Sequence, residues 1–278
     1  MSKHRNFIQS DSGKQDKTRT SQTLARGLQV LDAFRGRGLK DNLECLDPPE
    51  LGISDLAHTL SLSGTVVARL VATLVEYGYL FQNPRTKKYT LGLATFTLGL
   101  AAVPEMQLRN AAYSHLQHLA RLTGETVSLN VVDKHSLQGV CIASIDSPAQ
   151  IKLTTRVGSV RPLHRGASRK VLLAFLEIWQ QDLYIDTLEL EPTQADSLRK
   201  ELEKIRQRGY AYSEEELDEG AFAVATPILT REGHLLGGVA VAGPIFRKTP
   251  SLMAMWIEAV KQTTVDITGE LYSSSYSS

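Results

Sequence analysis

One arginine and two threonines near the N-terminus recur at a spacing that could read base pairs. Thr65, Arg69 and Thr73 fall four residues apart, so a helix places all three on one side. Arginine and hydroxyl groups hydrogen-bond to base edges in the major groove of duplex DNA. Three cations follow between residues 85 and 88, where they could neutralise phosphates. The residues predicted to contact DNA are Ser63, Gly64, Thr65, Ala68, Arg69, Thr73, Arg85, Lys87 and Lys88.

Residues 51–99 predict the elements that would present those side chains. The pattern reads as two short helices, with Ser54 as the expected N-cap of the first and Ser63 of the second. Gly78 is the expected end of the second helix, and residues 79–81 and 89–91 are the expected strands of a basic hairpin. The apolar stripe of the second helix is formed by Val67, Leu70, Val71 and Leu74.

This order of elements is typical of a winged helix-turn-helix. An ordinary packed subdomain with a solvated cationic loop is the alternative. Residues 1–100 hold 13 Lys and Arg against 9 acidic residues, and the remainder holds 18 against 21. A basic N-terminal part is compatible with a polyanionic partner, although the excess is mild.

The length and composition predict an α+β protein of two compact domains. The chain has 278 residues, 42% of them hydrophobic, which is enough for two cores. We expect a disordered arm at 1–22, a winged helix-turn-helix DNA-binding domain at 23–92, a helical linker at 93–124, an effector-binding domain at 125–272 and a disordered tail at 273–278.

The two cysteines, Cys45 and Cys141, have no metal-type spacing. This pattern favours a reducing compartment and gives no reason to expect a structural zinc site. The sequence has no apolar run of membrane-spanning length and no signal-peptide core. We therefore expect a cytoplasmic protein with no membrane partner, no metal and no cofactor.

The linker, residues 93–124, has few helix breakers, and Gly124 is a suitable stop. Its apolar residues could join two copies of the chain, and burial against the chain's own domains is equally compatible with their spacing. These residues include Phe96, Leu98, Leu100, Leu116 and Leu119.

From Thr126 onward the apolar period changes to two, which predicts strands. Strands are expected at 126–132, 139–143, 151–157, 210–212, 222–229 and 235–242. Helices are expected at 168–176, 195–208 and 251–272. An antiparallel sheet flanked by helices could hold a small molecule between the sheet and its loops.

Several spaced segments, in order, resemble the IclR family of bacterial transcriptional regulators. Besides residues 51–99 they are "GETVSLNVVD", "RVGSVRPLHRGASRKVLLAFL", "RGYAYSEEELDEGAFAVATPI" and "GGVAVAGP". The resemblance covers nearly all of residues 23–272. It implies a GAF-like C-terminal domain, a small-molecule effector, and homodimers or homotetramers on palindromic promoter DNA.

Carried over by position, the resemblance implies an effector pocket formed by Leu153, Ala167, Ser168, Ser213, Ala223, Ala240 and Ala242. In members that hold small keto or hydroxy acids, the positions of the last three tend to be Cys or Ser. A buried carboxylate without donors is costly, so we expect a mainly apolar or aromatic acid or amide. Alternatively, the alanines only pack against a helix.

The predicted recognition helix departs from the family pattern. The family usually has a polar pair such as Lys-Ser and then an aromatic residue or His before the Arg, whereas this chain has Gly64-Thr65 and Ala68 before Arg69. Operator reading is then expected to depend on Thr65, Arg69, Thr73 and the wing. Alternatively, Gly64 shortens the helix by a turn, because glycine in a helix costs about 1 kcal/mol relative to alanine.

The other side chains that could take part in catalysis show no pattern typical of an active site. His164 has no identifiable nucleophile or acid partner, Cys141 falls within an apolar strand, and the acidic run 214–219 lacks His or Cys at ligand spacing. Arg165, Arg169 and Lys170 could draw an anionic ligand to the pocket. An enzyme whose N-terminal unit is a protein-interaction module remains the alternative to a ligand-controlled regulator. The sign of regulation is not encoded in these residues.

Overall fold

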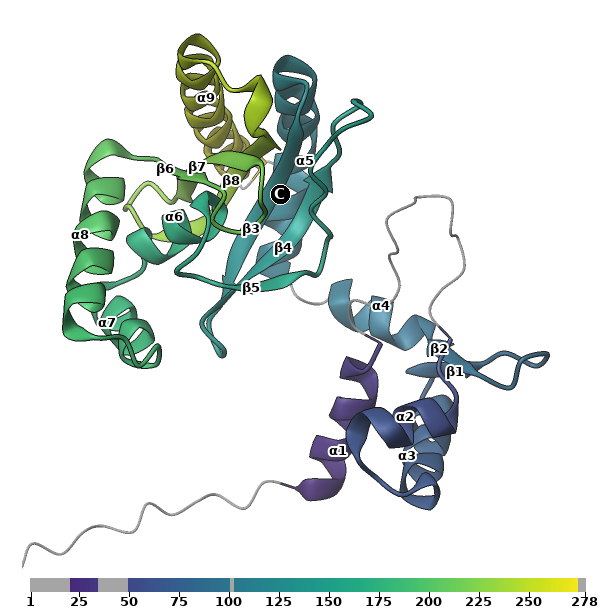
Figure 1. Cartoon of the computed structure of the whole chain (residues 1–278). Helices are drawn as coiled ribbons and strands as arrows, with labels where there is room; N and C mark the ends of the chain where they lie inside the picture. Colours follow the sequence, from purple (N-terminus) through teal and green to yellow (C-terminus); the bar gives the residue numbers. More distant parts are fainter. Residues whose placement is uncertain (1–20, 35–49, 101–102, 275–278) are drawn as a thin grey trace, which may run out of the picture. The chain divides into compact units, whose positions relative to one another are not determined.

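The computed structural model describes residues 21–34, 50–100 and 103–274, which form two compact units (Figure 1). The described part of the first unit extends to Ala94, and that of the second begins at Thr95. Most of the predicted arm and tail, the loop at 36–49 and Cys45 lie outside the described residues.

The first unit is a three-helix body with a hairpin (Figure 1). Its elements are α1 Gln22–Asp32, α2 Ile53–Leu60, α3 Gly64–Glu76, β1 Leu80–Gln82 and β2 Tyr89–Leu91. Val67 and Val71 of α3 are buried with Leu56 of α2 and Val30 of α1. The predicted apolar stripe is thus confirmed as the face of α3 that faces the core.

Capping residues mark the start of both helices of the motif, and one of the two predicted N-caps is wrong. α2 begins one residue before Ser54, because the Asp55 carboxylate accepts a hydrogen bond from the Gly52 N–H at 2.9 Å. The prediction of Ser54 as N-cap is therefore wrong. Ser63 does cap α3, accepting from the Val66 N–H, and α3 begins at Gly64, so Gly64 does not shorten the helix.

Gly78 ends α3 as predicted. It has φ +74°, its N–H donates to the Val75 carbonyl, and the Tyr79 N–H donates to the Leu74 carbonyl. This is the Schellman arrangement, which a glycine adopts without steric cost. Gly92 lies over the same turn, where a β carbon would lie 2.2 Å from the Gly78 carbonyl oxygen. The two glycines therefore fix the base of the hairpin against α3.

The second unit contains one six-stranded antiparallel sheet of order β5-β4-β3-β8-β7-β6. The strands are β3 Thr126–Asp133, β4 Gln138–Ile145, β5 Val160–Pro162, β6 Ala211–Glu214, β7 Ala221–Leu229 and β8 Leu235–Pro244. The helices are α5 Val103–Thr123, α6 Ala167–Phe175, α7 Ile178–Asp186, α8 Pro192–Arg208 and α9 Pro250–Ser274, with a 3-10 turn at Ile245–Arg247. The expected α+β class is confirmed.

Helices cover both faces of this sheet (Figure 1). α5 and α9 bury one face, on which Val127 and Leu129 of β3 contact Leu116 and Trp256 within one cluster. α6, with α7 and α8 beyond it, buries part of the other face around Leu172. The apolar residues of β3 thus enter the first core, and Thr126, Ser128 and Asn130 are buried on the other face of the sheet, so that β3 is buried at six successive positions.

One expectation for the second unit is wrong, and one helix of this unit was not expected. Residues 151–157 form no strand; instead, the Ile151 carbonyl accepts from Arg247 and the Leu153 carbonyl from the Thr126 hydroxyl. Side chains therefore satisfy the carbonyl groups that a strand partner would have bonded. The short edge strand lies at Val160–Pro162. Helix α7 was not predicted, because apolar residues occur all around it.

The linker region forms two helices, α4 Leu93–Leu100 and α5, and Gly124 ends α5 with φ +71°. Leu116 and Leu119 are buried against the sheet, which supports the alternative of burial within the chain for these two residues. Phe96 and Leu98 are exposed. Within the described ranges, no single helix is long and apolar enough to cross a membrane.

Candidate DNA interface and effector pocket

The exposed side of α3 carries the residues predicted to read bases. The axes of α2 and α3 turn through 114°, within the range typical of helix-turn-helix pairs. Thr65, Arg69 and Thr73 are exposed, Ala68 is partly buried, and Ser63 and Gly64 are exposed at the helix start. The Thr73 hydroxyl donates to the Arg69 carbonyl at 3.2 Å, so its lone pairs remain available to a donor.

The wing is a hydrogen-bonded turn that exposes its three cations. Asn83 Oδ1 accepts from the Arg85 and Thr86 N–H groups, and Asn83 Nδ2 donates to Glu50 Oε1 at 2.5 Å. Lys87 has φ +59°, and Arg85, Lys87 and Lys88 are all exposed. The turn therefore holds positive charge away from the body of the unit, as phosphate contact requires.

The floor of a pocket in the second unit lies along a lateral row of paired residues that crosses four strands, and Ala242, Ala223 and Ser213 of this row line the pocket. Thr126 pairs with Ala242, Ala242 with Ala223, and Ala223 with Ser213. Directly paired residues point to the same face of a sheet. Ala240, paired with Ser128, lies in the next row on that face. The resulting floor is methyl groups between hydroxyl groups.

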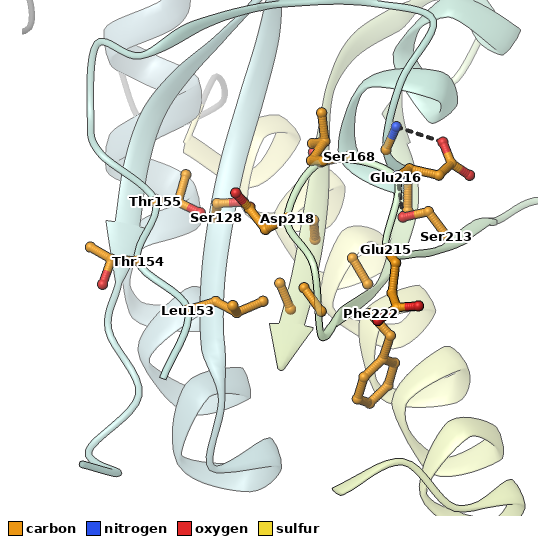
Figure 2. A pocket seen from close by; sticks show the side chains of 17 residues that line it. Ser128, Leu153, Thr154, Thr155, Ser168, Ser213, Glu215, Glu216, Asp218 and Phe222 are labelled. Carbon is orange, nitrogen blue, oxygen red and sulfur yellow. Dashed lines mark hydrogen bonds between the residues drawn. The ribbon is translucent and has the colours of Figure 1, made fainter. Parts of the chain in front are cut away.

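The start of α6 forms one wall and is capped by other parts of the chain. Gly166, its N-cap, has no side chain, so Glu216 Oε2 accepts from the Gly166 N–H at 2.9 Å and Ser213 Oγ accepts from the Ala167 N–H at 2.8 Å. Figure 2 shows both bonds as dashed lines. The first two N–H groups, which would otherwise suit an anion, are thus already bonded.

The loop between β6 and β7 closes over the same wall. Glu216 also accepts from the buried Lys170 ammonium at 2.6 Å, and Lys170 pairs with Glu201 at 2.5 Å. Leu217 lies directly over Gly166. The acidic run therefore forms a rim held to α6 by ion pairing and packing.

The opposite wall is the irregular segment that contains Leu153. The Thr126 hydroxyl donates to the Leu153 carbonyl at 2.5 Å and accepts from the Ser147 N–H at 3.0 Å. Arg247 links the buried Glu125 carboxylate to the Ile151 carbonyl. These contacts fix the segment against the sheet without a strand ladder.

All seven residues predicted for the effector pocket line this one cavity, whose volume is about 80 Å³. Leu153, Ala167 and Ser168 belong to its walls, and Ser213 and the three alanines belong to its floor. Figure 2 shows Leu153, Ser168 and Ser213 around the cavity. Prediction from sequence missed Ser128, Thr154, Thr155 and the rim acids. Ser128 was detectable, because it alternates with Val127 and Leu129 and must face the other side of β3.

Arg169 and Lys170 do not line the cavity. Both are 3% exposed, and Arg169 lies across Gly139, where a β carbon would lie 2.2 Å from the arginine Cδ. Burial lowers the pKa of Arg169 to about 10, and two of its nitrogen atoms, Nε and Nη1, have no partner among the described residues. Neither cation therefore contacts the cavity directly, because both side chains are buried inside the domain.

The surroundings of His164 and Cys141 fit a structural role for both residues. His164 Nδ1 lies 2.8 Å from the Tyr184 hydroxyl, which also accepts from the Leu163 N–H. Burial, with Arg165 nearby, lowers the pKa of His164. Cys141 is fully buried, and burial raises its pKa to about 11. Both arrangements agree with the sequence interpretation. The described residues contain no group of three potential metal ligands.

Two family models match the chain. The IclR helix-turn-helix domain matches residues 23–84, and the bacterial transcriptional regulator IclR C-terminal domain matches residues 100–268. The HTH-type transcriptional regulator KdgR of Escherichia coli K12 is 32% identical over 204 residues, covering 71% of this chain and 77% of KdgR. The HTH-type transcriptional repressor AllR of the same strain is 26% identical and covers 90% of each chain.

Solved structures agree with the fold. The IclR of Thermotoga maritima superposes with a TM-score of 0.67 at 26% identity, covering 90% of this chain and 98% of that protein. An IclR homologue of Microbacterium hydrocarbonoxydans, solved in complex with 4-hydroxybenzoate, has a TM-score of 0.76 at 20% identity and covers 90% and 99%. The relatives named are transcriptional regulators and not enzymes.

Proposed function

The chain belongs to the IclR family of bacterial transcriptional regulators, and from this premise we propose how its two units divide the work. The first unit reads operator DNA through α3 and the wing. The second binds a small organic molecule in the pocket bounded by α6, the Leu153 segment and the acidic rim. The observation that carries this proposal is the convergence of all seven predicted pocket residues on one cavity, in a chain that also exposes Arg69 and the wing cations.

DNA recognition divides between two kinds of contact. Arg69, Thr65 and Thr73 read base edges, because their side chains share the exposed face of α3. The wing cations bind phosphates and supply affinity that does not depend on sequence. Positions 64 and 68 are glycine and alanine here, where the family usually has a cation and an aromatic residue or His. The α3 helix of this chain therefore contacts fewer bases than the same helix of other members. We expect palindromic promoter sites, bound by a homodimer or homotetramer in the cytoplasm.

The effector is mainly apolar where it meets the floor. The Ala223, Ala240 and Ala242 methyl groups offer no hydrogen-bond donor, so a ligand gains there by burying carbon. The Microbacterium homologue complexed with 4-hydroxybenzoate supports an aromatic acid or a related amide as a class to test. Effector binding alters DNA affinity only if the ligand prefers one arrangement of the two units.

The decisive experiment is fluorescence anisotropy of the full chain on DNA from upstream of its own coding region. Titrations with and without aromatic and aliphatic acids and amides measure both activities together. Sequence-specific binding that one compound class shifts supports the proposal. Weak, salt-dependent binding that no compound changes contradicts the ligand-controlled part of it. Arg69→Ala serves as the control for specific DNA contact.

A further inference from the structure

We infer that the effector presents an uncharged polar group to the pocket, such as an amide or alcohol, and not a carboxylate. This inference rests on the proposed function, because it concerns the ligand of the same cavity. Three features of the lining carry it: the bonded state of the α6 N–H groups, the absence of a cation, and the distribution of hydroxyl groups.

Two of the N–H groups at the start of α6 that could receive a carboxylate, those of Gly166 and Ala167, are occupied by the chain itself. Gly166 donates to the Glu216 carboxylate and Ala167 to the Ser213 hydroxyl. A ligand carboxylate would have to displace Glu216, whose other oxygen is paired with the buried Lys170. The chain's own carboxylate thus fills the anion position that a helix N-terminus provides.

No lysine, arginine or histidine is found among the 17 lining residues that the structure describes around the cavity. Three of those residues are acidic: Glu215, Glu216 and Asp218. Lys170 neutralises Glu216, whereas the Glu215 carboxylate accepts a hydrogen bond from the Gly220 N–H and Asp218 is exposed at the rim. The lining therefore opposes a second negative charge, because like charges repel and a buried anion without a partner is costly.

Hydroxyl groups supply the remaining polarity and suit a neutral ligand. Ser128, Thr154, Thr155 and Ser168 line the cavity, and each hydroxyl can donate or accept. The carboxylates of the rim only accept. A ligand amide or alcohol offers both a donor and an acceptor, so it can pair with either kind of group, whereas a carboxylate offers acceptors alone.

Isosteric ligand pairs separate charge from size. A cavity of about 80 Å³ is smaller than the roughly 150 Å³ cavity that admits benzene in an engineered protein, so the pairs must include small members. We would use isobutyrate with isobutyramide and benzoate with benzamide, each measured on the full chain by thermal shift and by isothermal titration. Within each pair the shape is nearly the same, and the amide differs from the acid by its neutral charge and its N–H donors.

We expect the amide to bind at least about tenfold more tightly than its acid, because the lining opposes the charge. The double variant E215Q/D218N replaces the two rim acids by neutral isosteres. It should bind the acid more tightly and so reduce the ratio of acid to amide dissociation constants. E219Q is the matched control, because Glu219 belongs to the same loop but does not line the cavity. Both pocket residues are exposed, so folding should be preserved.

Acids that bind as tightly as their amides overturn the inference, as does a panel in which no neutral compound binds. The first result leaves the proposed function intact if Ala223→Leu, which fills the floor, abolishes acid binding while circular dichroism shows a folded protein. Ala242→Val is the milder second variant for the same purpose. Binding of neither class, in either pair, would contradict the proposed effector pocket as well.

Discussion

A β carbon on Gly166 would lie 2.4 Å from Cδ1 of Leu217, so the acidic rim closes directly on the start of α6. Gly166 also has φ +76° and ψ 149°, a region that other residues rarely adopt. Gly166→Ala should therefore lower the free energy of unfolding by about 1–3 kcal/mol, measured by urea denaturation, and loosen the rim.

Gly209→Ala is the comparison for a positive-φ glycine without a neighbouring side chain. Gly209 has φ +76° but ψ 10°, the less strained αL conformation, and its missing β carbon faces open space. Its substitution should cost less than that of Gly166. An equal loss in both variants would contradict the role of the Leu217 contact. Adding Leu217→Ala to Gly166→Ala should restore part of the stability, because it removes the clash and leaves only the strain.

The two DNA-contact roles predict different salt behaviour. Arg69→Ala should weaken operator binding by about 1–3 kcal/mol and relax base preference, whereas loss of one wing cation should reduce the salt slope by about one unit on every sequence. Because Lys87 has φ +59°, Lys87→Asn is a better variant than Lys87→Ala, since asparagine tolerates that conformation. Anisotropy titrations over a range of salt concentrations measure both effects, and identical behaviour of the two variants would refute the assignment.

Thr126→Val should disturb the pocket wall. The substitution keeps the shape but removes the hydroxyl that joins the Leu153 carbonyl to the Ser147 N–H. Leaving such groups unbonded costs about 1–3 kcal/mol, and Leu153 should lose its fixed position, so ligand affinity should fall as well. Thr126→Ser retains the hydroxyl and should bind ligand like the wild type. Normal affinity in the valine variant would show that the wall does not depend on this contact.

His164 should make the protein less stable in mild acid. Its pKa is lowered in the folded state, so between about pH 7 and the folded pKa the unfolded chain binds more protons and stability falls as pH falls. His164→Gln removes this contribution. Urea unfolding between pH 7 and pH 5 should therefore show a shallower pH dependence in the variant than in the wild type. Parallel curves would mean that burial does not disfavour the imidazolium.

Cys141 should react only when the domain opens. Burial raises its thiol pKa to about 11 and the side chain is fully buried, so little thiolate is present or accessible near pH 8. In a Cys45→Ser background, a chromogenic disulfide reagent should label Cys141 slowly in buffer and rapidly in urea. Rapid labelling in buffer would show that β4 opens readily.

The sequence predicted what local signals determine. The stripe of α3, the Ser63 cap and the Gly78 stop depend on residues within a few positions, and all three are confirmed. Residues 151–157 were misread as a strand, because their β-type composition gives no sign that Thr126 and Arg247 satisfy their carbonyl groups. Helix α7 was not predicted, because its sequence has apolar residues on the exposed side as well as on the buried side and therefore lacks an amphipathic period. The exposed apolar residues are Ile178, Trp179 and Leu183.

Seven of the residues that line the pocket were predictable, but its other lining residues and the pairing of its charges were not. A resemblance identified the seven positions that converge on one cavity. Lys170 is buried between Glu201 and Glu216, which lie 31 and 46 positions further along the sequence. Its burial therefore depends on long-range contacts. The same holds for the capping of Ala167 by Ser213. Long-range pairing of this kind leaves no periodic signature, which is why the local charge balance needed the structure.

The contact between Gly139 and Arg169 predicts that these two positions, 30 residues apart in the sequence, covary among homologues. Because the arginine stem fills the volume where a side chain at position 139 would lie, any larger residue on β4 requires a smaller one on α6. Homologues should therefore vary at these two positions together, with glycine at 139 wherever a long side chain occupies 169. Enlarging position 139 alone should therefore destabilise the domain, and a smaller residue at position 169 should restore part of the lost stability.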